Sequence, residues 1–182
     1  MTKGDKKIAE KLKLDDRIFK TSERESFLTL KDHKENFTNN KQTRLINPTK
    51  SEIGRISKKI LENVRDVVIE KTGLTQWKNT VSVLQWFKAI INPQKYTFIQ
   101  FDIINFYPSI SEKLLENAID WTSSFCPISD EQRKIIFHVR QNFLYKNGEP
   151  WVKKGETNFD VPMGAFDSAE ICDIVGLPAQ PS

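Results

Sequence analysis

The chain has 182 residues, which suits one domain or slightly more at ~100–200 residues per domain, and 38% of them are hydrophobic, enough for a core. Two cysteines cannot form a disulfide framework, so we expect an intracellular location, in the cytoplasm or nucleus. The charged N-terminus lacks the apolar stretch of a signal peptide, and no apolar run approaches the ~20 residues that cross a bilayer. These features argue against a secreted mini-protein and against a membrane protein.

The net charge of +4 is unevenly distributed along the chain. Residues 1–60 hold sixteen Lys and Arg against nine Asp and Glu, a net charge of +7, whereas the rest of the chain holds twelve against fifteen, a net charge of −3. A basic front half favours a polyanionic partner such as a nucleic acid. A solvated lysine-rich surface would give the same distribution, so charge alone leaves both interpretations open.

The pattern along the chain indicates a charged lead-in, two structured regions and a short tail, over residues 1–25, 26–95, 96–176 and 177–182. The lead-in is expected to be a short helix with a loose end. The tail shows no structural pattern. The functional signals are therefore sought in the two middle regions.

The first region begins with two short predicted strands, at 26–30 and 44–48, on either side of a basic, Asn-rich loop. A long amphipathic helix follows, because apolar residues recur at a spacing of three to four. The spacing from Thr49 to Glu52 predicts a capping box at its start, and Gly73 predicts its end.

The second region mixes predicted strands and helices. Residues 97–104 are mostly β-branched and aromatic, which predicts a buried strand. The other predicted elements are helices at 83–91, 112–125 and 130–144 (the last with a Ser129–Gln132 capping box), an Asn-Gly hairpin over 143–152, and a short helix ending at Gly176.

Asp102 stands inside the predicted apolar strand, between Phe101 and Ile103. A buried carboxylate is costly unless it is paired or binds a cation, and a strand end is a rigid support for a metal ligand. The alternative is a structural Asp that caps the turn after the strand.

The context of Asp102 favours the metal-binding interpretation. Residues 101–110, FDIINFYPSI, resemble motif A of reverse transcriptases, in which an Asp at the end of a palm strand binds the catalytic magnesium ions. The resemblance implies that Asp102 and the carbonyl group of Ile103 bind Mg²⁺, with Mn²⁺ as the alternative ion. It also implies that Tyr107, five positions after Asp102, selects the deoxyribose of the incoming nucleotide.

Residues 162–168, PMGAFDS, resemble motif B of the same family, in which a glycine precedes a serine by four positions. The resemblance implies that Gly164 shapes the template side of the nucleotide pocket, where the absence of a Cβ lets the backbone approach a base pair. The family's proline after the serine is replaced by Ala169. The acidic residues Asp167 and Glu170 are also unusual beside a nucleic-acid site.

The front region supplies a third resemblance. The segments LKDHK at 30–34 and RLINP at 44–48 are similar to the fingers of these enzymes, in particular those of the retroelement-encoded Penelope-like group. In that family the basic residues contact the triphosphate, which implies nucleotide-binding roles for Lys31, Lys34 and Arg44. Arginine suits this role because its guanidinium can bond phosphate oxygens bidentately. Taken alone, these residues would also fit an ordinary exposed basic hairpin.

The resemblance covers residues 26–176 and implies an α+β fold: the fingers (26–95) and a partial palm (96–176) of a right-hand polymerase, truncated before motif C. The implied activity is RNA-directed DNA synthesis, in which the primer 3′-OH of an RNA or DNA template–primer attacks the α-phosphate of a dNTP. Motif C would supply a second metal-binding carboxylate as an aromatic-x-Asp-Asp sequence, and none follows motif B here. Because a single carboxylate strand cannot form a two-metal clamp, the alternative is a catalytically inactive remnant that at most binds nucleic acid.

The predicted partial palm also has a consequence for association. A sheet interrupted after its first strand leaves the backbone of that strand unpaired and one apolar face uncovered. We therefore expect the chain to self-associate through this edge.

Overall fold

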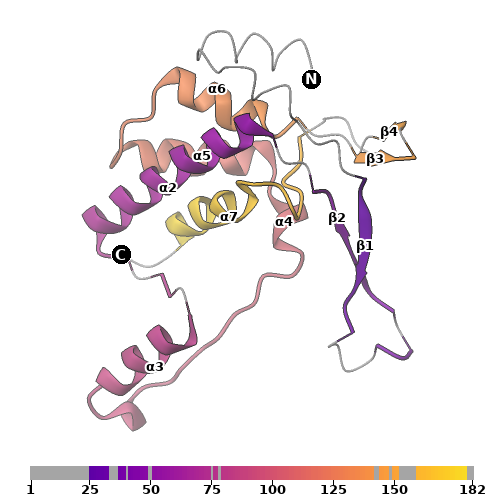
Figure 1. The fold of residues 1–182 in the computed structure, drawn as a ribbon. Helices are drawn as coiled ribbons and strands as arrows, with labels where there is room; N and C mark the ends of the chain where they lie inside the picture. Colours follow the sequence, from indigo (N-terminus) through magenta and orange to yellow (C-terminus); the bar gives the residue numbers. More distant parts are fainter. Residues whose placement is uncertain are drawn as a thin grey trace.

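The computed structural model describes residues 25–32, 37–39, 41–48, 51–74, 76–77, 79–141, 144–147, 149–151 and 159–179. The predicted lead-in, except Glu25, lies outside the described residues. In the described part, six α-helices and two two-stranded sheets form a mixed α and β structure, which confirms the predicted class at this level (Figure 1). None of these helices is long and apolar enough to cross a membrane.

Both sheets are antiparallel hairpins at predicted places. Strands β1 (Phe27–Leu30) and β2 (Thr43–Ile46) pair across the basic loop. Strands β3 (Leu144–Lys146) and β4 (Glu149–Trp151) confirm the Asn-Gly hairpin. Asn147 has a φ of 53°, the left-handed conformation that asparagine tolerates in a tight turn.

Helix α2 (Glu52–Thr72) confirms the predicted long amphipathic helix. It ends at Gly73, whose φ of 68° is the left-handed conformation typical of a helix C-cap. The predicted capping residue Thr49 is wrong, because the N-cap is Ser51. Its hydroxyl lies next to the first helical turn and accepts a hydrogen bond of 3.0 Å from the Gly54 N–H.

Apart from α4, which the pattern did not predict, the other helices lie where the pattern placed them, most of them with different ends. They are α3 (Thr80–Ala89), α4 (Phe106–Ser109), α5 (Glu112–Ser123), α6 (Asp130–His138) and α7 (Ser168–Gly176). The Ser129–Gln132 capping box of α6 is present. Helix α6 ends at His138, earlier than predicted, because the chain then turns and Gln141 bridges to Phe159. The predicted featureless tail contains a short 3₁₀ helix, η3 (Leu177–Ala179), whose Leu177 is buried.

The core is made mainly by helices, with α7 at its centre. Helix α7 packs against α2 and α5, and α6 packs against α2 (Figure 1). Apolar side chains with at most 4% exposure fill the space between these helices: Leu61, Val64, Val68, Leu115, Ala118, Ile119, Ile136, Ile171 and Ile174. Residues from both predicted structured regions therefore share one hydrophobic core.

The predicted buried strand at 97–104 is wrong. This segment carries no assigned strand, and Ile99, Phe101 and Ile104 are 73%, 86% and 83% exposed. A strand needs a hydrogen-bonded neighbour, and no strand within the described residues pairs with this segment. Asp102 is consequently an exposed carboxylate, and the argument from the cost of burying it does not apply.

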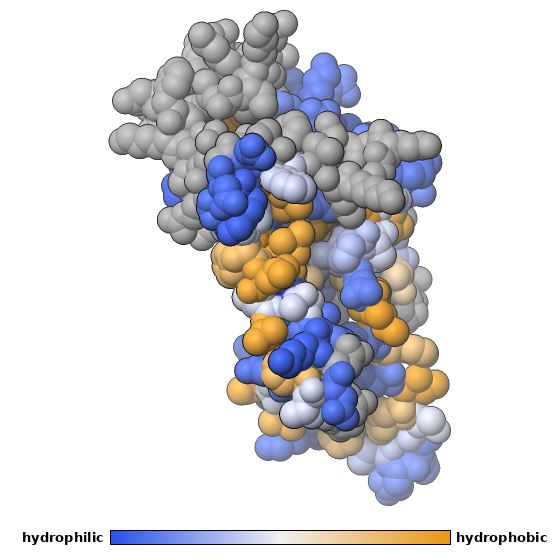
Figure 2. All heavy atoms as spheres, turned by 90° about the vertical axis from the view of Figure 1, so that its right-hand side faces the viewer, coloured by the Kyte–Doolittle hydropathy of each residue, from blue (hydrophilic) through white to orange (hydrophobic). Residues whose placement is uncertain are grey.

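Helix α3 and the segment after it carry many exposed apolar side chains. None of the residues of α3 is buried, and the α3 segment lies apart from the helical body in Figure 1. Aromatic rings of α3 contact rings from the segments before and after it. The centroids of Trp77 and Trp86 are 4.9 Å apart, and those of Phe87 and Phe98 are 5.1 Å apart. Figure 2 shows further apolar side chains interspersed with hydrophilic ones on the face turned toward its viewer. Most of the exposed large hydrophobic side chains of the described residues therefore lie within residues 77–104.

Candidate functional site

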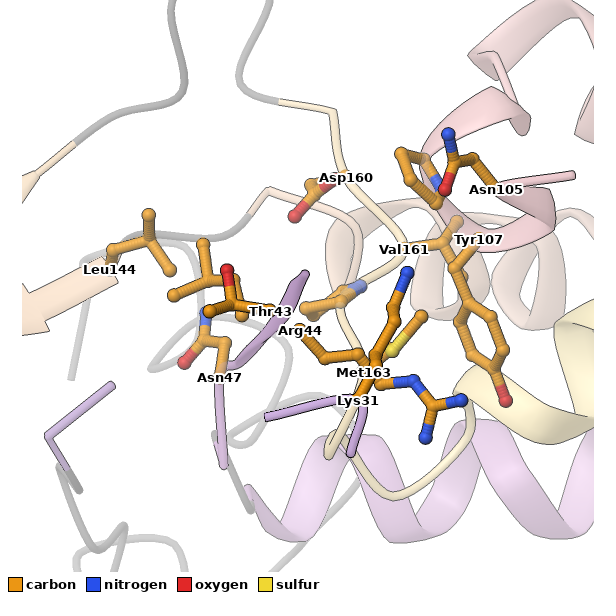
Figure 3. A pocket seen from close by; sticks show the side chains of 13 residues that line it. Lys31, Thr43, Arg44, Asn47, Asn105, Tyr107, Leu144, Asp160, Val161 and Met163 are labelled. Atoms are coloured by element: carbon orange, nitrogen blue, oxygen red, sulfur yellow. The ribbon is translucent and has the colours of Figure 1, made fainter. Parts of the chain in front are cut away.

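A pocket of about 220 Å³ lies between the β1–β2 hairpin, helix α4 and the loop that precedes α7 (Figure 3). It brings together segments that are far apart in the sequence. Its lining residues are Lys31, Thr43, Arg44, Leu45, Asn47, Asn105, Tyr107, Pro108, Leu144, Asp160, Val161, Pro162 and Met163. Three of the predicted nucleotide-binding residues are among them: Lys31, Arg44 and Tyr107.

The β1–β2 hairpin supplies two cations to the pocket. Lys31 directly follows β1, and its backbone N–H donates to the Gln42 carbonyl at 2.9 Å, which extends the hairpin to its position. Arg44 lies on β2, opposite Thr29. In Figure 3 both side chains lie beside Met163, with the Tyr107 ring across from them. With Asp160 as the acidic lining residue, the balance of formal charge in the pocket is positive, which favours an anionic ligand.

Tyr107 reaches the pocket from the short helix α4. Asn105 precedes this helix with a φ of 54°, a left-handed conformation that asparagine adopts more readily than most residues, and so turns the chain into α4. Burial raises the pKa of the Tyr107 hydroxyl, and the neighbouring Cys172 thiol raises it further. Burial also raises the pKa of Cys172, to about 12. At neutral pH both groups keep their protons, so Tyr107 presents a neutral ring to the pocket while its hydroxyl is hydrogen-bonded to Cys172.

Gly164 lies where the backbone of the loop before α7 comes close to the end of β2. Its φ is 109°, and a Cβ at this position would lie 3.0 Å from the Asn47 carbonyl oxygen and 3.0 Å from Ile46 Cγ2. One residue earlier, the Met163 carbonyl accepts a hydrogen bond of 2.9 Å from the Asn47 N–H. The close backbone approach that requires glycine is therefore made to β2; the predicted approach to a base pair stays a prediction.

The two unusual acidic residues of this region are neutralised within the fold. Asp167 is fully buried and forms an ion pair with the fully buried Arg140. Glu170 is buried and lies 2.9 Å from the Lys58 ammonium, and its hydrogen bond raises the pKa of that lysine. Neither carboxylate lines the pocket, so neither repels an anion there.

The predicted metal ligands are not part of the pocket. Asp102 and Ile103 lie on the exposed segment before α4 and do not line the cavity. Within the described ranges, no three His, Cys, Asp or Glu side chains lie close enough together to hold a metal ion. Magnesium is commonly held by one or two carboxylates together with substrate phosphates, so its binding by Asp102 and Ile103 stays a prediction. Lys34 lies outside the described residues.

Sequence reasoning missed several lining residues, namely Asn47, Asn105, Leu144, Asp160 and Val161. Asn47 is 2% exposed and Asn105 adopts a left-handed conformation. Asparagine directly before proline, as at 47–48, and asparagine directly after an apolar run, as at 105, are turn signals that could have drawn attention to both. Leu144 and Val161 carry no such signal, because an apolar residue is not distinctive outside its tertiary context.

Comparison of the chain with family models, with curated proteins and with solved structures finds no match. The likeness to reverse transcriptases therefore stands on the three sequence motifs, and the functional argument on the pocket.

Proposed function

We propose that the pocket binds the triphosphate and deoxyribose of a dNTP, and that the chain is the fingers and partial palm region of an enzyme of the reverse transcriptase family. The activity of that family is RNA-directed DNA synthesis on a template–primer. One observation carries the proposal. Lys31 and Arg44 were singled out from one motif and Tyr107 from another, and all three line one cavity.

The chemistry of the lining suits this ligand. Arg44 offers a planar fork of N–H donors for phosphate oxygens, and Lys31 adds a compact positive charge. Tyr107 supplies a half-buried ring that the sugar of the ligand can pack against. Contact with this ring would exclude a 2′-OH. Gly164 keeps the opposite wall of the pocket against β2.

The direct test is equilibrium binding, measured by calorimetry with a dNTP, the matching ribonucleotide and inorganic tripolyphosphate. The proposal expects the dNTP and tripolyphosphate to bind and the ribonucleotide to bind more weakly than the dNTP. Absence of binding for all three would contradict it. Equal binding of the two nucleotides would contradict only the proposed selection of deoxyribose by Tyr107.

A second candidate function is that of a catalytically inactive remnant that at most binds nucleic acid. The observation that favours it is the place of Asp102, exposed and outside the pocket. Because a two-metal clamp needs a second carboxylate, we expect no primer extension by the 182-residue chain with Mg²⁺ or Mn²⁺. Template-dependent dNTP incorporation that disappears in Asp102→Ala would refute this expectation and favour the active enzyme.

The predicted strand edge is not present, but we also propose that the chain self-associates through the exposed apolar side chains of residues 96–104. Sedimentation velocity over a concentration series should show a dimer or larger species. Placing a charge at Phe101 (Phe101→Lys) should weaken the association about tenfold or more, because a central apolar anchor is lost. Leu28→Lys, at a 63% exposed position on β1, is the matched control and should leave association unchanged. A monodisperse monomer at all concentrations would contradict the proposal.

A further inference from the structure

The Arg140–Asp167 ion pair is the most deeply buried charged contact among the described residues. Both side chains are 0% exposed, and an Arg140 Nη2–H donates to Asp167 Oδ1. The pair is incompletely satisfied, because Arg140 Nε and Nη1 and Asp167 Oδ2 have no hydrogen-bond partner. Such a pair is weak evidence for stability, since the cost of desolvating two charges offsets most of their attraction. Its placement suggests a different role.

Arg140 holds the loop before α7 at both of its ends. At the first end, the Asp160 N–H donates to the Arg140 carbonyl at 2.9 Å. At the other end, the Arg140 guanidinium holds Asp167, the N-cap residue of α7. The Asp167 side chain makes no capping hydrogen bond to its own helix. Its carboxylate is directed to Arg140 in place of the usual N-cap contact.

The loop that is held this way forms one wall of the pocket. Asp160, Val161 and Met163 line the cavity, as Figure 3 shows, and the Met163 carbonyl is bonded to the Asn47 N–H at the middle of the loop. We propose that Arg140 is the positioning residue of this wall, and that it sets the place of residues 160–163 by gripping the loop at 160 and at 167. For the ligand, the inference rests on the proposed function; for the loop, it rests on these contacts alone.

The test replaces the ion pair by two apolar side chains, so that an effect on the position of the loop can be told from an effect on the stability of the fold. In Arg140→Met combined with Asp167→Leu, both charges are removed together, so the fold should keep its Tm or gain slightly. The loop loses its grip at 167, so the Kd for tripolyphosphate should rise about tenfold or more, since small displacements of a binding wall are costly. The Asn47 amide should exchange with solvent about tenfold faster, because its acceptor is on the freed loop.

Two further variants give the control and the rescue. Arg133→Gln combined with Asp120→Asn removes an Arg–Asp pair of the same chemistry between α5 and α6, at side chains that are 30% and 63% exposed, and should change neither the Kd nor the Asn47 exchange. Arg140→Lys keeps the charge and an N–H donor toward Asp167. Its Kd for tripolyphosphate should therefore stay within about threefold of that of the wild type.

The outcomes distinguish this inference from the proposed function. If the wild type binds no tripolyphosphate but the apolar pair still speeds Asn47 exchange, the proposed function fails and the positioning role stands. If the apolar pair leaves both binding and exchange unchanged, the positioning role is overturned. The positioning role is also overturned if the Arg140→Met, Asp167→Leu double variant does not fold, because the ion pair then serves the whole fold. It is overturned as well if Arg140→Lys binds as weakly as the double variant, because the ion pair then serves only its own packing.

Discussion

Replacing Asp167 by alanine should lower the free energy of unfolding by about 3–5 kcal/mol, because it leaves the Arg140 guanidinium buried without a counter-charge. The attraction that is lost matters less than the charge that is left behind. For a chain of this length such a change corresponds to a Tm lower by roughly 6–20 °C. Thermal melts followed by circular dichroism measure it directly.

The control for this experiment is Asp120→Ala, which removes the partner of Arg133. The Asp120 side chain is 63% exposed, so water solvates both charges after the change and the cost should be about 0–1 kcal/mol. A loss of similar size in the two variants would show that burial of the Arg140–Asp167 pair has no special cost. Arg140→Met with Asp167→Leu should be far less destabilised than Asp167→Ala, since no unpaired charge is left.

Reversing the charge of Arg44 should have the largest effect on binding. Arg44→Glu places a carboxylate in the pocket beside Asp160 and removes a guanidinium, so binding of tripolyphosphate or a dNTP should fall about a hundredfold or more. The fold should be unaffected, because Arg44 is exposed on β2. Calorimetric titration at a fixed ionic strength, with the Tm of both proteins measured in parallel, checks the two expectations together.

The same variant tests the contact with nucleic acid through its salt dependence. Three phosphate contacts, from Lys31, Lys34 and Arg44, predict a log–log slope of duplex affinity against salt of roughly −3, and Arg44→Glu should flatten it to roughly −2. Lys11→Glu, in the charged lead-in, makes the same change of net charge elsewhere in the basic front half. If it weakens binding as much as Arg44→Glu does, the basic front half acts only as a solvated charged surface.

Elements whose signals are local could be predicted from the sequence. Helix α2 follows from its apolar spacing and from Gly73, because glycine has no Cβ and adopts the left-handed conformation of a C-cap at no steric cost. The start of α6 follows from the Ser129–Gln132 capping box, and the β3–β4 turn from Asn147 and the glycine after it. In each case the residues that decide the structure lie within a few positions of one another.

The candidate site could be predicted only in part. Lys31, Arg44 and Tyr107 were identified as residue types in motifs, but their meeting in one cavity depends on how the β1–β2 hairpin packs against α4 and the loop before α7. The Arg140–Asp167 pair gave no local signal, because its members are 27 positions apart and each is unremarkable by itself.

By itself the sequence determined the hairpins, the helices other than α4 and the basic character of the hairpin residues, because capping, turn formation and helical periodicity are local interactions. Only the tertiary structure decided whether residues 97–104 form a strand, since a strand exists only where a second backbone pairs with it. The tertiary structure also decided that Asp167 is neutralised by Arg140 and that the backbone at Gly164 lies close to the end of β2. Burial and close approach arise only where distant parts of the chain meet.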